Sequence, residues 1–183
     1  MSSIILRTQK LCKSFSNGGL QQHVLKNMDL EIIEGDFTVI MGASGSGKST
    51  LLYALSGMDR PTLGKVYFED AEISKYTNDE LAIFRRKNCG FVFQNIYLLE
   101  NMSIFDNILT AALVVQKNSK QLIQKVKMLL QQVGLEENLW DKFPNQLSGG
   151  ESQRVAIIRS IINNPKIIFA DEPTGALNSA ASL

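Results

Sequence analysis

Residues 42–49, "GASGSGKS", contain glycine, lysine and serine at the spacing GxxxxGK[ST], which is typical of phosphate-binding loops. Glycine lets the backbone approach an anion closely and adopt positive φ values. The loop N–H groups and the amino terminus of a following helix favour negative charge, and Lys48 adds a cation for the β and γ phosphates. The Ser49 hydroxyl suits Mg²⁺. The apolar stretches on either side favour a strand and a helix, which argues against a chance glycine-rich turn.

An acidic pair follows an apolar run in "KIIFADEP", residues 166–173. Such a run predicts a strand of a parallel sheet that is buried on both faces. Asp171 then emerges at the carboxyl end of the strand, where α/β sheets bind ligands, and we expect it beside Ser49 and a nucleotide-bound Mg²⁺. Glu172, one residue further, can orient or deprotonate water. A surface turn is the alternative, and the phosphate loop makes it the weaker one.

A third pattern, "LSGGESQR" at residues 147–154, separates the classes of nucleotide-binding protein that share the first two. Ser148 offers a hydroxyl, Gly149 and Gly150 allow close approach, and an apolar helical face follows. The chain here resembles the ABC ATPase family, and the resemblance covers nearly the whole sequence. It implies that this signature binds the nucleotide of a second subunit, so that two copies pair head to tail with ATP between them.

The family resemblance also implies roles for individual residues. Phe15 corresponds to the aromatic residue that stacks on adenine, and Gln94 to the glutamine that contacts Mg²⁺ and the attacking water and senses the transport subunit. A core phenylalanine and an ordinary strand-end glutamine are the alternatives. The catalytic residues so implied are Glu172 and Gln94, and the metal ligands are Ser49, Gln94 and Asp171. The residues implied for ATP binding are Phe15, Gly42, Ala43, Ser44, Gly45, Ser46, Gly47, Lys48, Ser49 and Thr50. The residues implied for the partner's ATP are Ser148, Gly149, Gly150 and Glu151.

Composition places the chain among ordinary globular proteins. Its 183 residues are 44% hydrophobic and 20% charged, with a formal charge of +1, which gives no reason to expect nucleic acid. No stretch approaches the roughly 20 apolar residues of a membrane span, so we expect no direct membrane insertion. The two cysteines, Cys12 and Cys89, match no metal spacing and indicate buried thiols of a reduced cytoplasmic chain.

Several elements are expected to position these motifs. Two antiparallel strands are joined by a turn at "NGG", and residues 36–41, "DFTVIM", form a strand before the phosphate loop. Strands at "KVYFE" and "GFVFQ" flank a helix that begins with the capping box "TNDE". Ser103 caps a further helix, and Leu122, Val126, Leu129 and Val133 share one face of the next, which ends at Gly134.

The expected fold is therefore α/β: a P-loop NTPase core with a parallel sheet, an antiparallel amino-terminal part and an inserted helical subdomain. We expect one ABC ATPase domain, with a β-rich P-loop core at 1–94, the helical subdomain and signature at 95–160, and the acidic strand and following loop at 161–183. The β-rich core holds the phosphate loop. The signature lies at the far end of the helical part.

The leading functional hypothesis is the ATP-hydrolysing subunit of a membrane transporter. Its cofactors are ATP and Mg²⁺, and its partners are a second copy and an integral membrane permease that holds it on the inner face of the membrane. The motifs look most like the branch that serves lipoprotein release, macrolide export and bacitracin-type peptide efflux. The alternative is an ATP-gated module that signals to a membrane partner controlling cell-wall enzymes. Repair or chromosome ATPases are disfavoured by the lack of heptads, and a small-molecule kinase leaves the signature without a purpose.

The sequence also departs from the family pattern. Asn178 replaces the usual aspartate of the loop after the acidic strand, and the family's switch histidine has no counterpart, since the only histidine is His23 in the amino-terminal hairpin. We therefore expect the natural domain to continue beyond Leu183. Without the missing strand, the polypeptide is expected to be unstable or rearranged and to hydrolyse ATP poorly. A further expectation is a permease-docking surface at "NIYLLENMS", with Tyr97, Leu98 and Leu99 partly exposed.

Overall fold

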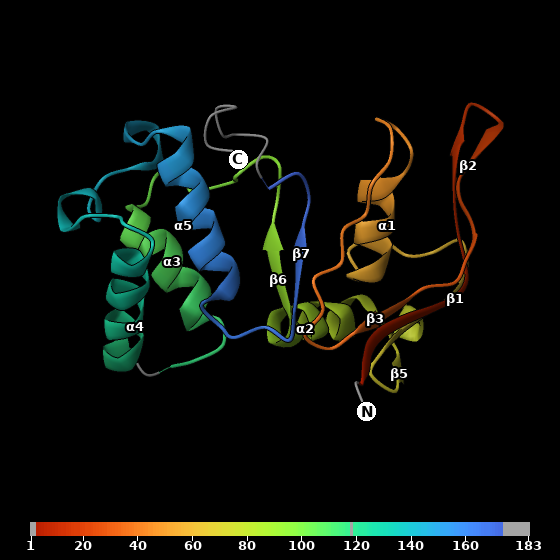
Figure 1. The fold of residues 1–183 in the computed structure, drawn as a ribbon, viewed down its shortest axis with the longest axis horizontal. Helices are drawn as coiled ribbons and strands as arrows, with labels where there is room; N and C mark the ends of the chain where they lie inside the picture. Colours follow the sequence, from red (N-terminus) through yellow and green to blue (C-terminus); the bar gives the residue numbers. More distant parts are fainter. Residues whose placement is uncertain (1–2, 118, 174–183) are drawn as a thin grey trace. The chain divides into compact units, whose positions relative to one another are not determined.

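The computed structural model describes residues 3–117 and 119–173 (Figure 1). The chain forms two compact units, residues 1–83 and 84–183, and each is described by itself. The α/β architecture expected from the sequence is confirmed, with antiparallel strands in the first unit and a parallel strand pair beside helices in the second.

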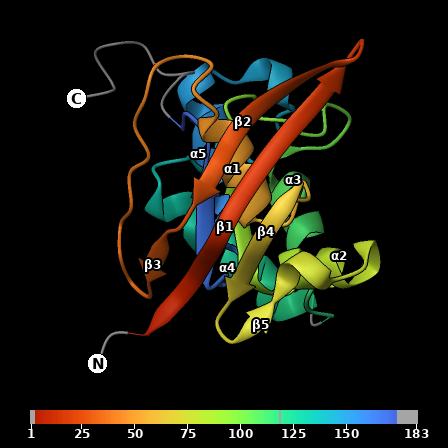
Figure 2. The ribbon, with the colours of Figure 1, turned by 90° about the vertical axis from the view of Figure 1, so that its right-hand side faces the viewer.

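The first unit is built on an antiparallel sheet (Figure 2). Its order is β2-β1-β4-β5, and β3 also pairs with β1. The strands are β1 (Ile4–Asn17), β2 (Leu20–Met28), β3 (Glu31–Ile33), β4 (Leu63–Phe68) and β5 (Ala71–Glu72). The expected hairpin is confirmed, because Gly18 and Gly19 both have positive φ between β1 and β2. Helix α1 (Lys48–Leu55) contacts β1 and β2, and a 3-10 turn (Ile73–Lys75) follows β5.

The predicted strand at residues 36–41 is wrong for this structure. The segment has no strand conformation, and Phe37 is 94% exposed and Met41 87% exposed. Its β-branched residues favour extended backbone, but a strand also requires a neighbour to take its hydrogen bonds. No described strand of the first unit pairs with it. The sequence pattern thus predicts the preference of residues 36–41 for extended backbone, but it does not predict whether a neighbouring strand pairs with them.

The second unit contains a parallel pair, β6 (Cys89–Val92) and β7 (Ile167–Ala170), paired from Cys89 with Ile167 to Val92 with Ala170. The predicted burial of the acidic strand on both faces is wrong among the described residues: Phe169 is buried, but Ile168 is 48% exposed. A run of apolar residues cannot by itself determine which elements cover it. Both thiols, Cys12 and Cys89, are only partly buried rather than buried.

The helices of the second unit follow the expected patterns closely. Ser103 caps α3 (Ile104–Leu113) by accepting a hydrogen bond from the Asp106 N–H. Helix α4 (Ser119–Gln132) is followed by Gly134 at φ 71°, and α5 (Gly149–Ile161) packs with α3 and α4. Between α4 and α5 lie the short 3-10 turns Glu137–Leu139 and Pro144–Gln146. The fully buried side chains of this core include Ile104, Ile108, Ala112, Leu122, Val126, Leu130, Leu135, Val155, Ile158 and Ile162.

Helix α2 (Asn78–Asn88) begins with the predicted capping box. The Thr77 N–H and hydroxyl donate to the Glu80 carboxylate at 2.7 and 2.9 Å, and the Glu80 N–H donates back to the Thr77 hydroxyl.

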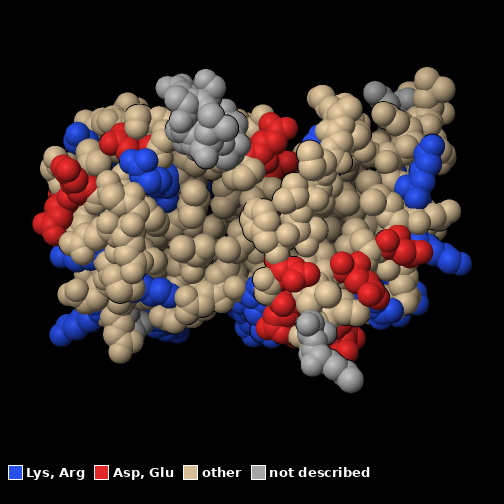
Figure 3. Space-filling view, in the orientation of Figure 1, with Lys and Arg blue, Asp and Glu red and all other residues tan. Residues whose placement is uncertain are grey.

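Basic and acidic side chains are interspersed on the face shown in Figure 3. None of the helices in the described part of the chain has the length and apolarity needed to cross a bilayer.

Gly64 in β4 is predicted to be the least replaceable glycine of the sheet. Its φ is +87°, and an added Cβ would lie 2.2 Å from the Lys10 carbonyl oxygen. Gly64→Ala should lower the free energy of unfolding in urea by more than about 3 kcal/mol, since strain and clash combine. Gly134→Ala is the matched control, because its φ is +71° but nothing lies within 4 Å; it should cost about 1 kcal/mol. Equal costs for the two variants would contradict the role of the contact with Lys10.

Candidate nucleotide-binding site

The phosphate loop leads directly into α1, as the sequence predicts. Gly45 and Gly47 have φ values of 76° and 95°, a conformation that favours glycine. Gly47 also lies against β2, where an added Cβ would come within 2.7 Å of a Val24 methyl. Gly47 precedes Lys48 at the start of the helix, and no described side chain caps its N–H groups. The amino terminus of α1 therefore offers backbone donors and a positive dipole end to an anion.

Lys48 folds back over this loop. Its Nζ donates to the carbonyls of Gly42 and Ala43, both at 3.0 Å, so the ammonium lies on the loop itself. Ser49 and Thr50 follow in the first turn of the helix. The set consists of backbone N–H groups, one ammonium and two hydroxyls. The N–H groups and the ammonium are hydrogen-bond donors that suit a nucleotide polyphosphate, and the hydroxyl oxygens suit Mg²⁺, so the residues present fit both groups.

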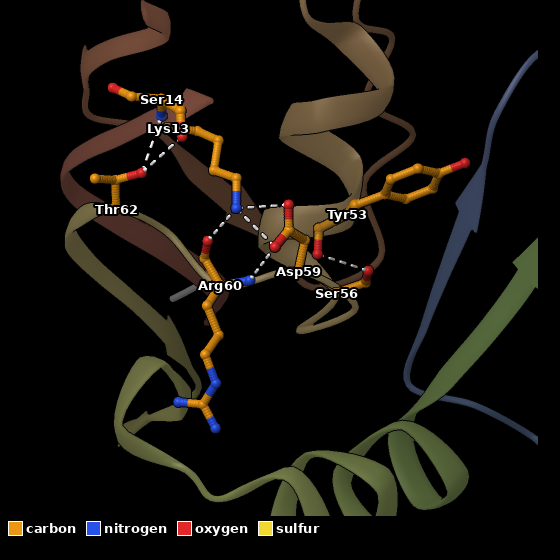
Figure 4. Close-up of polar contacts among 7 residues, drawn as sticks. All are labelled: Lys13, Ser14, Tyr53, Ser56, Asp59, Arg60 and Thr62. Atoms are coloured by element: carbon orange, nitrogen blue, oxygen red, sulfur yellow. Dashed lines mark hydrogen bonds and ion pairs between the residues drawn. The ribbon is translucent and has the colours of Figure 1, made fainter. Parts of the chain in front are cut away.

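The aromatic residue Phe15 lies on β1 and is 43% exposed, which argues against the core-phenylalanine alternative. The Lys13 ammonium lies 5.0 Å from its ring centroid. Lys13 also pairs with Asp59 at 2.7 Å and donates to the Arg60 carbonyl at 2.7 Å (Figure 4). These contacts join β1 to the segment that follows α1, and they fix the strand that carries Phe15.

Thr62, the residue before β4, closes the same network. Its hydroxyl accepts from the Ser14 N–H at 2.9 Å and donates to the Ser14 carbonyl at 3.3 Å (Figure 4). Lys13 is only 9% exposed, so its charge is held where the Asp59 carboxylate compensates it. No sequence pattern predicts this ion pair, because its partners are 46 residues apart and belong to no motif.

In the second unit, the acidic residues and Gln94 emerge at the same edge of the β6–β7 pair. Val92 and Ala170 are opposite one another, and the Asp171 N–H donates to the Val92 carbonyl at 2.9 Å. Gln94 and Glu172 each follow two residues later and are exposed. Glu172 has a φ of 47°, unusual for a residue with a side chain. The structure thus brings together three predicted site residues at the carboxyl ends of parallel strands.

Gln153 supports this acidic edge, although sequence reasoning did not single it out. It lies on α5, is 3% exposed, and its Nε2 donates to the Pro173 carbonyl at 2.6 Å, directly after Glu172. Its Oε1 has no protein partner among the described residues. A buried polar group costs free energy unless it is hydrogen-bonded, and the bond to the Pro173 carbonyl compensates the Nε2 of this side chain. The available signal was a glutamine two positions before the buried Val155 of the signature helix.

The signature residues form the start of α5, as predicted. Ser148 is the N-cap: its Oγ accepts from the Glu151 N–H at 3.3 Å, while its own N–H and hydroxyl donate to the Glu151 carboxylate at 2.7 Å. Ser148 and Gly149 are exposed, and Gly150 follows in the first turn. The hydrogen bonds from Ser148 lower the pKa of Glu151. This stabilisation is present above the ordinary glutamate pKa and is lost as the pH falls through the lowered value.

Residues 95–102, "NIYLLENM", are here called the docking segment. Tyr97 is 65% exposed and Leu99 50%, while Leu98 packs partly against the helical core. The prediction that these side chains are partly exposed is confirmed. Asn107 on α3 holds the backbone: its Oδ1 accepts from the Leu99 N–H at 2.7 Å, and its Nδ2 donates to the carbonyls of Leu99, Met102 and Ser103. The segment therefore presents apolar side chains from a fixed backbone.

His23 is an exposed residue of the β1–β2 hairpin, and its Nδ1 lies 2.8 Å from the Ser14 hydroxyl oxygen. Asn178 lies outside the described residues. Within the described ranges, no three His, Cys, Asp or Glu side chains form a metal-binding group.

Comparison with known proteins identifies the class to which this fold belongs. Residues 25–175 match the ABC transporter family, and the chain belongs to that family as an ATP-binding subunit. It is 42% identical over 182 residues to the lipoprotein-releasing system ATP-binding protein LolD of Idiomarina loihiensis, covering 100% of this chain and 79% of that protein. It is 41% identical to the bacitracin export ATP-binding protein BceA of Halalkalibacterium halodurans, covering 97% and 70%.

The fold agrees with a solved structure of the same class. A dimeric structure of a post-hydrolysis state of the ATP-binding cassette MJ0796, bound to ADP and Pi, superimposes with a TM-score of 0.89 at 38% identity. The match covers 96% of this chain and 77% of that one. The fold class and family expected from the sequence are therefore confirmed.

Proposed function

We propose that this chain is the ATP-hydrolysing subunit of an ABC exporter for a peptide, lipoprotein or drug-like substrate. Two copies pair head to tail, ATP closes the dimer and hydrolysis reopens it. The observation that carries the proposal is the exposed start of α5, where Ser148 and Gly149 face solvent in a chain that has its own phosphate loop. The exposed start of α5 is a second anion site besides the phosphate loop, and in a head-to-tail dimer it would bind the nucleotide that the other copy holds. The names of the relatives LolD and BceA support an export role.

The residues divide the reaction between them. Lys48 and the loop N–H groups hold the β and γ phosphates, and Phe15 stacks on adenine. Ser49, Gln94 and Asp171 would hold Mg²⁺, which would compensate the charge that develops on the phosphates. Glu172 orients or deprotonates the attacking water. A permease holds the dimer at the inner face of the membrane.

Mixing two inactive variants tests the head-to-tail site. Lys48→Ala disables the phosphate loop and Ser148→Arg the signature, so each variant alone should release little phosphate from ATP. A mixed dimer contains one site with both parts intact, and mixing should restore turnover that neither variant has alone. The assay contains no phosphoacceptor, so it also separates an ATPase from a small-molecule kinase. Failure to restore turnover, with both variants folded, would reject the shared site.

The docking segment is predicted to bind the permease. Leu99→Asp places a charge in an apolar contact and should lower retention of the chain by membranes that contain a co-expressed candidate permease, by roughly tenfold. Val114→Asp is the matched control, because Val114 is a 56% exposed apolar residue at the end of α3 and lies outside the segment. Equal loss of retention in both variants, or in neither, would argue against this surface.

A further inference from the structure

Arg159 on α5 is bonded to the backbone of the docking segment. Its two terminal nitrogens donate to the carbonyls of Tyr97 and Ile96, both at 2.7 Å. The residues that meet here are more than sixty positions apart in the chain. The planar guanidinium fork matches two successive carbonyls, a geometry that a lysine ammonium cannot reproduce.

This arginine is held without a carboxylate partner among the described residues. Burial lowers the pKa of Arg159, which shows that its surroundings disfavour the charged form. The two hydrogen bonds to backbone carbonyls therefore offset the cost of burying the Arg159 guanidinium. Its two carbonyl acceptors lie in a segment whose Tyr97 adopts a φ of 45°, a left-handed conformation that a residue with a side chain reaches only when neighbours hold it.

The docking segment thus has two separate anchors. Asn107 on α3 fixes its carboxyl-terminal half, from Leu99 to Met102, and Arg159 fixes Ile96 and Tyr97. Only the Arg159 anchor belongs to α5. That helix starts at the Ser148 cap, about 16 Å along its axis from Arg159, and it also holds the Pro173 carbonyl through Gln153.

We propose that Arg159 is a positioning residue that couples the docking segment to the signature helix. A partner helix that moves the segment displaces α5 with it, and ATP bound against Ser148 biases the segment in return, because coupling between two sites is reciprocal. The inference rests on the proposed function, since it assigns the route between the partner surface and the ATP-dependent dimer.

Amide hydrogen exchange of the full chain tests the anchor without nucleotide. Arg159→Met should raise exchange in residues 95–102 roughly tenfold or more, because two hydrogen bonds that oppose local opening are lost. Arg159→Lys can restore one bond, so exchange in residues 95–102 of this variant should be slower than in Arg159→Met and faster than in wild type. Lys125→Met is the matched control. The Lys125 ammonium donates to Ile162 O and Asn164 Oδ1, just after the carboxyl-terminal end of α5, and its loss should leave exchange in residues 95–102 unchanged. If Arg159→Met unfolds the chain, the lysine variant decides.

Addition of ATP and Mg²⁺ tests the coupling. In the Glu172→Gln background, ATP should change exchange in residues 95–102 of the otherwise native chain, and Arg159→Met should abolish that change while calorimetry still detects ATP binding. The proposal is overturned if Arg159→Met exchanges like wild type, if the ATP-dependent change persists in it, or if ATP changes nothing in the native segment. Absence of ATP binding to the native chain would instead reject the proposed function, and the nucleotide-free comparison would still decide the role of Arg159.

Discussion

Replacing Lys48 with alanine is expected to remove most of the affinity for ATP. The ammonium is the only side-chain cation of the loop, and it already lies on the inner carbonyls of Gly42 and Ala43 at 3.0 Å. Truncating one member of a desolvated, hydrogen-bonded charge pair leaves the other uncompensated, which lowers affinity by roughly 30-fold to 1,000-fold. Titration calorimetry with Mg-ATP measures the change directly.

The same substitution at an exposed lysine provides the control. Lys65 lies on β4 of the same unit and is exposed. Lys65→Ala therefore removes an equal charge at a position outside the phosphate loop. Its affinity for ATP should stay close to that of wild type. If Lys48→Ala bound ATP within about a factor of two of wild type, the assignment of residues 42–49 as the phosphate site would be wrong.

Sequence was most informative where the signal is local. The capping box at Thr77 and the helix stop at Gly134 involve residues within a few positions of each other, and both appear as predicted. Their hydrogen bonds and φ values depend on neighbouring residues in the sequence and not on the tertiary surroundings. For the same reason, the motifs in residues 42–49 and 147–154 placed two of the candidate sites correctly at helix starts.

Sequence was least informative where distant residues decide the outcome. Arg159 resembles an interruption of an apolar run, and only the fold shows that it bonds carbonyls more than sixty residues away. Gln153 gains its role from Pro173 twenty positions later. Residues 36–41 have the composition of a strand, but pairing is a property of the neighbour. The polar contacts that fix the site therefore become visible with the structure.

In a chain completed to family length, Glu172→Gln is expected to separate ATP binding from ATP hydrolysis. The amide has nearly the shape of the carboxylate but cannot accept the proton of the attacking water. Glu172 is exposed at the edge of the β6–β7 pair, and Gln153 holds the next residue, so the substitution should leave the backbone in place. Turnover should fall by roughly 100-fold to 10,000-fold, as for loss of a general base, with little change in the Kd for ATP.

A dimer trapped by ATP would give the second readout, since a copy that binds but does not hydrolyse ATP stays closed. Light scattering with Mg-ATP should show more dimer for Glu172→Gln than for wild type. Glu136→Gln makes the same chemical change at an exposed position just after α4 and should affect neither turnover nor dimer. Undiminished turnover in Glu172→Gln would remove this residue from the reaction. Lost ATP binding would instead show that the carboxylate supports the fold of the acidic edge, because hydrolysis and binding would then fail together.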